Sequence, residues 1–391
     1  MADAETILRK LIKKIFQNLD AFVPGITIRA LTSGGANYTS TLYSATVELR
    51  NNDTLKLFAK VANVNEKIRQ IMKVGTLFST EDFVYTDLAL VYNKLQEKHG
   101  IPLEERFKFP KFYGSHLSDK EETVVLEDLV ANGYGMYSRF KSVDWDYMAA
   151  AVTALAKFHA LSFAYRKEDP VNFEKTVERV TVVPDSTDNP DMKETWGKMM
   201  SGAVQVVKNE YKERLLKFLS AESAKEEFYK FRMPLSTPVL CHGDYRISNL
   251  MFRRRNDELE PIVLDYQLLH PGSPVVDLLY LEFLGTDEQF RADHHQRLLD
   301  HYYEQLILAM GKLDVDTGVY SRETFDSEYT EMLPLALRIT AIILPLVTVE
   351  AERAPRLDGE AEVKDIAITP NELFAERFRG IVNDCVRWGA L

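Results

Sequence analysis

Three polar side chains that could do chemistry follow short apolar runs in the second half of the chain. His242-Gly243-Asp244 comes directly after the apolar run 238–241, and Asn249 lies five positions beyond Asp244. A second apolar run, 250–252, leaves this polar turn, and Asp265 follows a further apolar run, 261–264. Such runs predict short strands, which would fix the backbone on both sides of the polar turn. We therefore expect Asp244, Asn249 and Asp265 to project from a rigid frame toward one place.

The residue types and the spacing of this group suit phosphoryl transfer from ATP. Loops that perform this chemistry carry an Asp base, an Asn metal ligand five positions later, and a further metal-binding Asp after a strand. Mg²⁺ prefers oxygen ligands, so Asn249 and Asp265 are the expected metal ligands. Asp244 would take the proton of an acceptor hydroxyl. Either Asp alone fits an ordinary polar turn, but the whole group favours catalysis.

A loop with two adjacent glycines suits the covering of a nucleotide phosphate. Gly34, Gly35 and Asn37 lie between two runs rich in β-branched residues, 26–31 and 41–50, which predict strands. Adjacent glycines let backbone N–H groups approach a phosphate closely. The alternative is a plain hairpin, because Gly-Gly is also common between paired strands.

Lys60 lies among apolar residues in the next predicted strand, 55–61, where it could reach nucleotide phosphates. In kinases a strand lysine with this role is held by a glutamate on a helix. A helical pattern runs from residue 66 to residue 98, and Glu81 is our candidate for that glutamate. Asp82 points about 100° away around the helix, which makes it the weaker candidate. The alternative for each of these charged residues is a place in solvent.

Glu127-Asp128-Leu129 follows two further predicted strands, 110–116 and 123–126. We interpret this segment as the hinge between two lobes. The backbone near Glu127 and Leu129 would bond the adenine edge, and the leucine side chains would cover the adenine face. On this interpretation residues 1–129 form an N-terminal lobe that binds nucleotide. Residues 130–391 form a C-terminal lobe with the catalytic loop and the acceptor site.

Outside the strands, most of the chain shows helical spacing of apolar residues. We expect helices within residues 4–19, 145–165, 192–231, 286–312, 322–354 and 371–388, and a loop over 168–191. His159 lies on an apolar helix, where a histidine is more often structural than catalytic. Asp277, near the start of a further helix, would either cap that helix or brace the catalytic loop.

The composition excludes several classes of protein. With 391 residues, 46% of them hydrophobic and 11% aromatic, the chain is long and apolar enough for a large folded core. A net charge of −11 argues against a nucleic-acid partner. The two cysteines are far apart and indicate no disulfide framework. We see no signal peptide and no membrane span, so we expect a cytoplasmic protein.

These motifs together resemble the ecdysteroid-kinase-like proteins, which are relatives of choline and aminoglycoside kinases. The residues that carry the resemblance are Gly34-Gly35-Ala36-Asn37-Tyr38, Lys60, Phe78, Glu81, Tyr85, Val125 to Leu129, Ala156 to Ala160, His242-Gly243-Asp244, Asn249, Leu264-Asp265-Tyr266-Gln267 and Asp277-Leu278. Two departures stand out. Arg246 occupies a position where the family often has Trp, and Ala36 occupies one where a charged residue is common.

The resemblance implies an α+β, bilobal, protein-kinase-like fold, with an N-terminal antiparallel sheet lobe and a larger, mainly helical C-terminal lobe. It also implies ATP and Mg²⁺ as cofactors. The acceptor would be a hydroxyl group of a hydrophobic small molecule, with an ecdysteroid as the favoured candidate.

Three other functions compete with this one. A choline- or aminoglycoside-type kinase would bind a cationic acceptor through acidic or aromatic groups. A non-catalytic binding protein on the same scaffold would have lost a motif residue, and none is lost here. A metal-dependent phosphohydrolase would use His242, Asp244 and Asp265 as ligands, but it leaves Lys60 and the glycine loop unexplained. The sequence does not give the oligomeric state.

Overall fold

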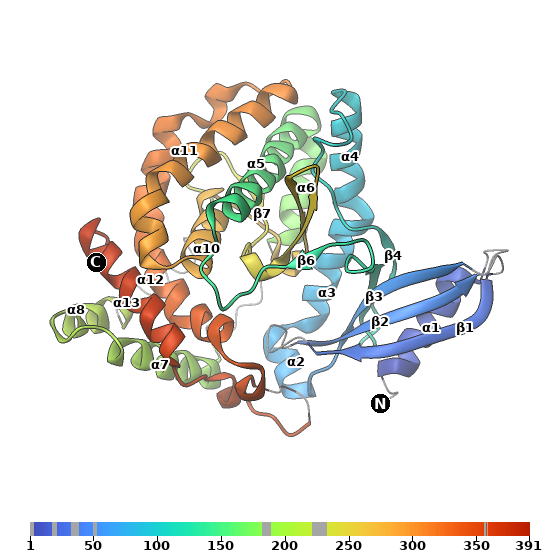
Figure 1. The fold of residues 1–391 in the computed structure, drawn as a ribbon, viewed down its shortest axis with the longest axis horizontal. Helices are drawn as coiled ribbons and strands as arrows, with labels where there is room; N and C mark the ends of the chain where they lie inside the picture. Colours follow the sequence, from blue (N-terminus) through green and yellow to red (C-terminus); the bar gives the residue numbers. More distant parts are fainter. Residues whose placement is uncertain are drawn as a thin grey trace.

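A computed structural model describes residues 4–17, 22–32, 39–49, 53–181, 189–220, 233–355, 357 and 359–391. An antiparallel sheet lies on the N-terminal side of the molecule, and a larger group of helices forms the rest (Figure 1). The glycine loop with Gly34, Gly35 and Asn37 lies outside the described residues.

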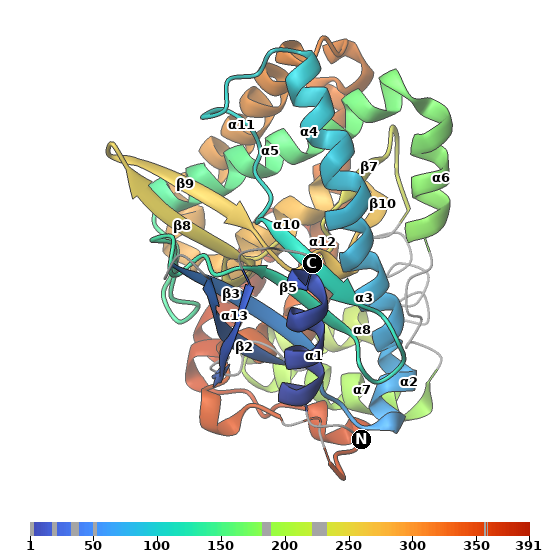
Figure 2. The ribbon, with the colours of Figure 1, turned by 90° about the vertical axis from the view of Figure 1, so that its right-hand side faces the viewer.

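The sheet has five strands in the order β1-β2-β3-β5-β4, and each neighbouring pair is antiparallel. The strands are β1 (Phe22–Leu31), β2 (Ser40–Leu49), β3 (Thr54–Ala62), β4 (Phe112–His116) and β5 (Thr123–Glu127). Helix α1 (Ala4–Phe16) packs on one face of this sheet (Figure 2). Its buried side chains contact Leu57, Ala59 and Val61 of β3. Because side chains alternate along a strand, Lys60 points to the opposite face.

The opposite face of the sheet is covered by a helical segment with several parts. It consists of α2 (Glu66–Met72), α3 (Val74–Phe83), a π-helical turn (Val84–Leu88) and α4 (Ala89–Lys98). Lys73, with φ 48°, separates α2 from α3. Sequence periodicity predicts this whole segment as helical, and the structure agrees. Glu81 lies in the last turn of α3 and is buried.

The helices of the larger part are α5 (Trp145–Glu168), α6 (Pro170–Val180), α7 (Pro190–Gln205), α8 (Asn209–Leu219), α10 (Val275–Gly285), α11 (Glu288–Lys312), α12 (Arg322–Thr348) and α13 (Glu372–Arg387). The prediction of a loop over 168–191 is wrong, because α6 lies within it. Asp169 caps α6 by accepting a hydrogen bond from the Asn172 N–H, and Pro170 occupies the first turn. Pro in that position favours a helix start, since its missing N–H would have no partner there.

Two small sheets hold the segments on both sides of the catalytic loop. β7 (Val239–Cys241) pairs with β10 (His270–Gly272). β8 (Leu250–Arg255) pairs with β9 (Glu258–Val263) and with β6 (Gly135–Met136). The polar turn therefore leaves one paired strand and enters another, as the apolar runs predict.

Two helical segments, Trp145–Glu168 and Thr317–Thr348, are long and apolar enough to cross a bilayer. Their most apolar windows are 72% and 67% buried inside the protein. Both therefore behave as core helices of the larger part, where α5 packs against α11 and α12 packs against α10 and α13.

Segments from the C-terminal part of the chain also contact helix α2 on the N-terminal side. Asn65, which caps α2, donates from its backbone N–H to the Leu357 carbonyl at 3.2 Å and from its side chain to the Ala361 carbonyl at 2.6 Å. Lys67 forms an ion pair with Asp191 of α7 at 3.0 Å. These contacts fix the helix that immediately precedes the one carrying Glu81.

Candidate active site

Asp244 and Asn249 meet across a tight turn between β7 and β8. The Asn249 side-chain Nδ2 donates to the Asp244 carbonyl and to Asp244 Oδ2, both at 2.9 Å. The Asn249 backbone N–H donates to the Arg246 carbonyl at 2.8 Å. Because Nδ2 faces Asp244, the Asn249 Oδ1 points away from that carboxylate. Within the described part of the chain this oxygen accepts no hydrogen bond, so it could serve as a metal ligand.

Asp244 is buried, and two opposing effects act on its carboxylate. Burial raises the pKa of Asp244 above its ordinary value, while the positive charge of Arg246 partly offsets this rise. The Arg246 Nε donates to Asp244 Oδ2 at 3.0 Å. Sequence patterns do not predict the contact between Arg246 and this carboxylate, although Arg246 lies only two residues after Asp244 in the same turn.

Asp277 braces the catalytic loop, which decides between the two roles that the sequence left open. Its Oδ2 accepts the His242 N–H at 2.7 Å, and its Oδ1 accepts the Gly243 N–H at 2.9 Å. Gly243 has φ 82°, and a Cβ there would lie 2.2 Å from the Leu268 carbonyl oxygen, so only glycine fits. His159 also bonds Asp277, at 3.1 Å. Asp277 therefore holds the catalytic loop in position, and His159 in turn orients Asp277.

His159, Cys241 and Asp277 also lie close enough together to resemble a buried metal site. Each already has another partner. His159 Nδ1 lies 2.8 Å from the Tyr302 hydroxyl, and the Cys241 thiol donates to the Ser273 carbonyl at 3.2 Å. Burial raises the pKa of Cys241, so the thiol keeps its proton. We therefore assign this cluster to structure.

Lys60 lies between two carboxylates that come from distant parts of the chain. Its Nζ is 2.9 Å from Glu81 Oε2 and 2.6 Å from Asp265 Oδ1. It also donates to Gln267 Oε1 at 2.9 Å, a contact that the sequence did not predict. The contact with Glu81 is the one that helix spacing predicts, whereas Asp82 bonds Ser115 at 2.5 Å.

The charges in this cluster support one another. Burial alone would lower the pKa of Lys60, but Asp265 and Glu81 together raise it above its ordinary value. Burial alone would raise the pKa of Asp265, but the Lys60 charge and hydrogen bond hold it below its ordinary value. Asp265 has φ 67°, a conformation that Asp tolerates. The carboxylate is thus ionised and presented next to the turn that carries Asn249.

We predict that Lys60→Met and Glu81→Gln each reduce activity and that their effects are not additive. Because the two side chains act as one ion pair, the double variant should lose much less than the sum of the single losses. The expected coupling is about 1–3 kcal/mol, from kcat/KM of the two single variants, the double variant and the unchanged protein. Asp82→Asn, one residue from Glu81, is the matched control. Strictly additive losses would contradict the pairing.

The hinge segment offers fewer free backbone groups than the sequence suggested. The Glu127 N–H donates to the Lys111 carbonyl at 2.9 Å, and the Asp128 N–H donates to the Lys56 carbonyl at 3.2 Å. The Leu129 N–H donates to no acceptor within the described part of the chain. The Leu129 side chain is buried beside Tyr134. Of the three backbone N–H groups of this segment, only that of Leu129 therefore remains as a candidate donor to adenine.

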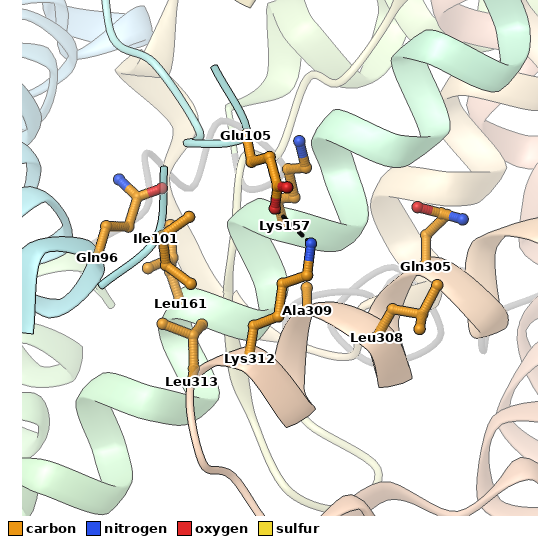
Figure 3. A pocket seen from close by; sticks show the side chains of 10 residues that line it. All are labelled: Gln96, Ile101, Glu105, Lys157, Leu161, Gln305, Leu308, Ala309, Lys312 and Leu313. Carbon is orange, nitrogen blue, oxygen red and sulfur yellow. Dashed lines mark hydrogen bonds and ion pairs between the residues drawn. The ribbon is translucent and has the colours of Figure 1, made fainter. Parts of the chain in front are cut away.

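A separate cavity of about 120 Å³ lies between the end of α4, α5 and α11 (Figure 3). Lys157 and Lys312 extend toward Glu105 at its edge, and Leu161 and Leu313 line its interior. None of its lining residues belongs to the cluster around Lys60 and Asp244. It is therefore distinct from the candidate active site.

The chemistry of the donor set fits a divalent cation and a nucleotide. Asn249 and Asp265 offer the amide and carboxylate oxygens that Mg²⁺ prefers. Lys60 offers a positive ammonium group beside Asp265, and such a group can bind a phosphate oxygen.

Comparison with known proteins decides the family. Residues 34–315 match the ecdysteroid kinase-like family. The chain belongs to that family. An ecdysteroid kinase-like chain is expected to keep the motif residues above, and the match contains Lys60, Glu81, Asp244, Asn249 and Asp265. The fold is α+β and bilobal in the manner of protein kinases, with an antiparallel sheet on the N-terminal side and a larger, mainly helical C-terminal part.

One curated relative of this ecdysteroid kinase-like chain is an uncharacterized kinase-like protein of Caenorhabditis elegans. It is 25% identical over 201 residues, which are 50% of this chain and 51% of that protein. The match therefore spans about half the length of the curated relative.

Solved structures of small-molecule kinases are similar at a greater distance. An ethanolamine kinase of Plasmodium vivax is 12% identical, with 97% of this chain and 87% of that chain covered and a TM-score of 0.48. A microcompartment-associated aminopropanol kinase is 12% identical, with 97% and 96% covered and a TM-score of 0.47. A macrolide 2'-phosphotransferase of Brachybacterium faecium is 14% identical, with 93% and 98% covered and a TM-score of 0.41. These likenesses are too distant to bear on the substrate.

Proposed function

We propose that this protein is an ATP-dependent kinase that phosphorylates a hydroxyl group of a small molecule. The observation that carries the proposal is the position of Lys60, 2.9 Å from Glu81 and 2.6 Å from Asp265. These residues lie on β3, on α3 and after β9, and the fold brings them together beside the turn with Asp244 and Asn249. A strand lysine, a helix glutamate and a metal-binding aspartate are the parts that hold ATP in kinases.

Each residue has a distinct role in the proposed reaction. Lys60 holds nucleotide phosphates and is itself oriented by Glu81. Asn249 and Asp265 hold Mg²⁺, which when bound neutralises phosphate charge. Asp244 orients the acceptor hydroxyl and takes its proton as the oxygen attacks the γ-phosphorus. ADP leaves as the bond to the γ-phosphorus breaks.

The nucleotide base is proposed to lie against the hinge. The Leu129 N–H would donate to the adenine ring, and the Glu127 carbonyl would accept from the adenine amino group. Gly34, Gly35 and Asn37 would cover the phosphates, a role that follows from the sequence alone because these residues lie outside the described part of the chain.

We also propose the division into lobes at residues 129/130. The chain leaves β5 through a turn in which Asp128 Oδ1 accepts the N–H groups of Val130 and Ala131, at 3.0 and 3.3 Å. Gly133, with φ 81°, continues this turn. A short turn with local side-chain bonds is a suitable connection between two separately packed parts. The two free, buried cysteines fit the cytoplasmic location that we propose.

The proposed acceptor is a hydrophobic, hydroxylated molecule, with an ecdysteroid as the first candidate. Membership of the ecdysteroid kinase-like family supports this class. Burial of the sterol skeleton should contribute a favourable binding free energy of about 25 cal/mol per Å² of apolar surface removed from water. We therefore expect ecdysone to bind with a negative heat-capacity change. Calorimetric titration in the presence of Mg²⁺ and a non-hydrolysable ATP analogue measures this.

Choline is the competing acceptor in the same titration. Its binding would depend on charge and would weaken as salt is added. Saturable choline binding with no response to any steroid would contradict the proposed acceptor and leave the kinase assignment in place. A panel of steroids, cholines and aminoglycosides, assayed for phosphate incorporation, then identifies the acceptor that turns over.

A further inference from the structure

Helices α5 and α11 each build one side of the cavity that lies apart from the candidate active site. Lys157 and Leu161 are four positions apart on α5, so they lie on the same face of that helix. The lining residues on α11 are likewise spaced by three or four positions or adjacent, namely Gln305, Leu308, Ala309 and Lys312. Each helix therefore presents apolar side chains and one lysine to the same cavity (Figure 3).

The interior of this cavity is mainly apolar. Ile101, Leu161 and Leu313 line it, and all three are buried. Gln96 also lines it, but the Gln96 amide is occupied by the Phe107 backbone, donating to its carbonyl at 3.1 Å and accepting its N–H at 2.7 Å. An occupant would therefore meet hydrocarbon in the interior and would place any charged group at the edge.

The edge of the cavity carries an excess of positive charge. Lys312 forms an ion pair with Glu105, whereas Lys157 forms no ion pair and no hydrogen bond within the described part of the chain. Burial and the positive charge of Lys312 lower the pKa of Lys157, and Lys108 adds to this effect while Glu105 opposes it. Three lysines thus act together with one glutamate. Lys157 is a partly buried cation whose charge the protein does not balance.

Charge and size together define the class of molecule that fits this cavity. A partly buried ammonium group without a partner is unfavourable, and an anion beside it removes that cost. A single lysine offers one point charge, which matches one carboxylate. An apolar protein cavity of about 150 Å³ takes up a benzene ring, so about 120 Å³ suits a chain of about four or five carbon atoms.

We propose that the cavity between α5 and α11 is a binding site for a small carboxylic acid with a short apolar chain. The carboxylate pairs with Lys157 at the edge, and the chain lies against Leu161 and Leu313 in the interior. None of the residues of this site belongs to the proposed kinase machinery. The site therefore stands or falls independently of the proposed function.

The test compares two molecules of nearly the same shape and different charge, pentanoate and pentanamide. Each is titrated calorimetrically into the full-length protein at neutral pH, without nucleotide. We expect pentanoate to bind about ten- to hundred-fold more tightly than pentanamide, because a hydrogen bond to a charged group is worth about that much. Acetate should bind more weakly than pentanoate because it leaves the interior unfilled, and octanoate should gain nothing further because the cavity is already full.

Substitutions separate the charge from the cavity. Lys157→Met should lower the affinity for pentanoate to that for pentanamide, and Lys157→Arg should keep most of the preference. Ala309→Met extends a side chain of α11 into the cavity and leaves both lysines in place, so it should weaken the binding of both molecules. Lys141→Met is the matched control, since it removes an exposed lysine outside the lining and should change neither affinity.

Several results would overturn the site. Absence of pentanoate binding, or equal affinities for pentanoate and pentanamide in the unchanged protein, would show that Lys157 recognises no carboxylate. Full pentanoate affinity in Ala309→Met would place the binding outside the cavity, and this result serves even if Lys157→Met does not fold. An affinity that rises steadily from acetate to octanoate would indicate general adsorption to apolar surface instead of a cavity of fixed size.

Discussion

Asp244→Asn is expected to lower kcat by roughly 10²–10⁴ while leaving the affinity for Mg²⁺ and ATP nearly unchanged. An amide has the shape of the carboxylate and can keep a bond from Arg246, but it does not accept the proton of the acceptor hydroxyl. The measurement combines steady-state kinetics with calorimetric titration of nucleotide. Near-normal turnover in this variant would contradict the role of Asp244 as the base.

The dependence on pH gives a second readout of the same residue. Burial raises the pKa of Asp244 above its ordinary value of 3.8, and the carboxylate must be ionised to act as a base. The rate of the unchanged protein should therefore fall as the pH is lowered through this raised value. The acid limb of the profile should be absent from the residual rate of Asp244→Asn. Asp257→Asn, in the exposed turn between β8 and β9, is the matched control and should keep the profile.

Asp265→Asn is expected to weaken Mg²⁺-dependent nucleotide binding by about ten- to hundred-fold, because it removes a charged ligand oxygen. The substitution also removes one of the two carboxylates that form ion pairs with Lys60. Lys60, the proposed partner of the phosphates, is then oriented less firmly. Nucleotide affinity is measured calorimetrically with and without Mg²⁺. Asp265→Asn should bind nucleotide equally in both conditions, whereas Asp257→Asn should respond to Mg²⁺ as the unchanged protein does. A full response to Mg²⁺ in Asp265→Asn would contradict its role as a metal ligand.

Local patterns in the sequence were sufficient to place much of the candidate site. Strand alternation sends Lys60 to the face opposite α1, and helix spacing brings Glu81 toward it. Asn249 lies five positions after Asp244 in the same turn, so their contact needs no distant part of the chain. These relations follow from backbone geometry within one or two neighbouring elements.

Contacts between distant segments could not be predicted in the same way. Asp277 lies 35 residues from His242, and nothing local distinguishes a helix cap from a brace for the loop. The Glu127 N–H donates to the Lys111 carbonyl because of the register in which the segment leading into β4 pairs with β5. The sequence does not specify this register.

The missed helix α6 has another cause. The Asp and Pro residues within 168–191 predict a loop, although Asp169 directly before Pro170 is also a strong signal for the start of a helix. The contact between Arg246 and Asp244 does not follow from the sequence, because a single charged residue in a turn has many possible partners. Only the packed loop shows that Arg246 donates to the Asp244 carboxylate.

The most direct test of the proposed function is transfer of a labelled γ-phosphoryl group from ATP to an added alcohol. Purified protein is incubated with γ-labelled ATP, Mg²⁺ and the acceptor panel, in parallel with Asp244→Asn, and the label is followed into the extracted small molecules. We expect label on a hydroxyl of at least one acceptor, dependent on Mg²⁺, and lower by roughly 10²–10⁴ with Asp244→Asn. Label that appears only as free phosphate, at the same rate in both proteins, would contradict the assignment of this site to a small-molecule kinase.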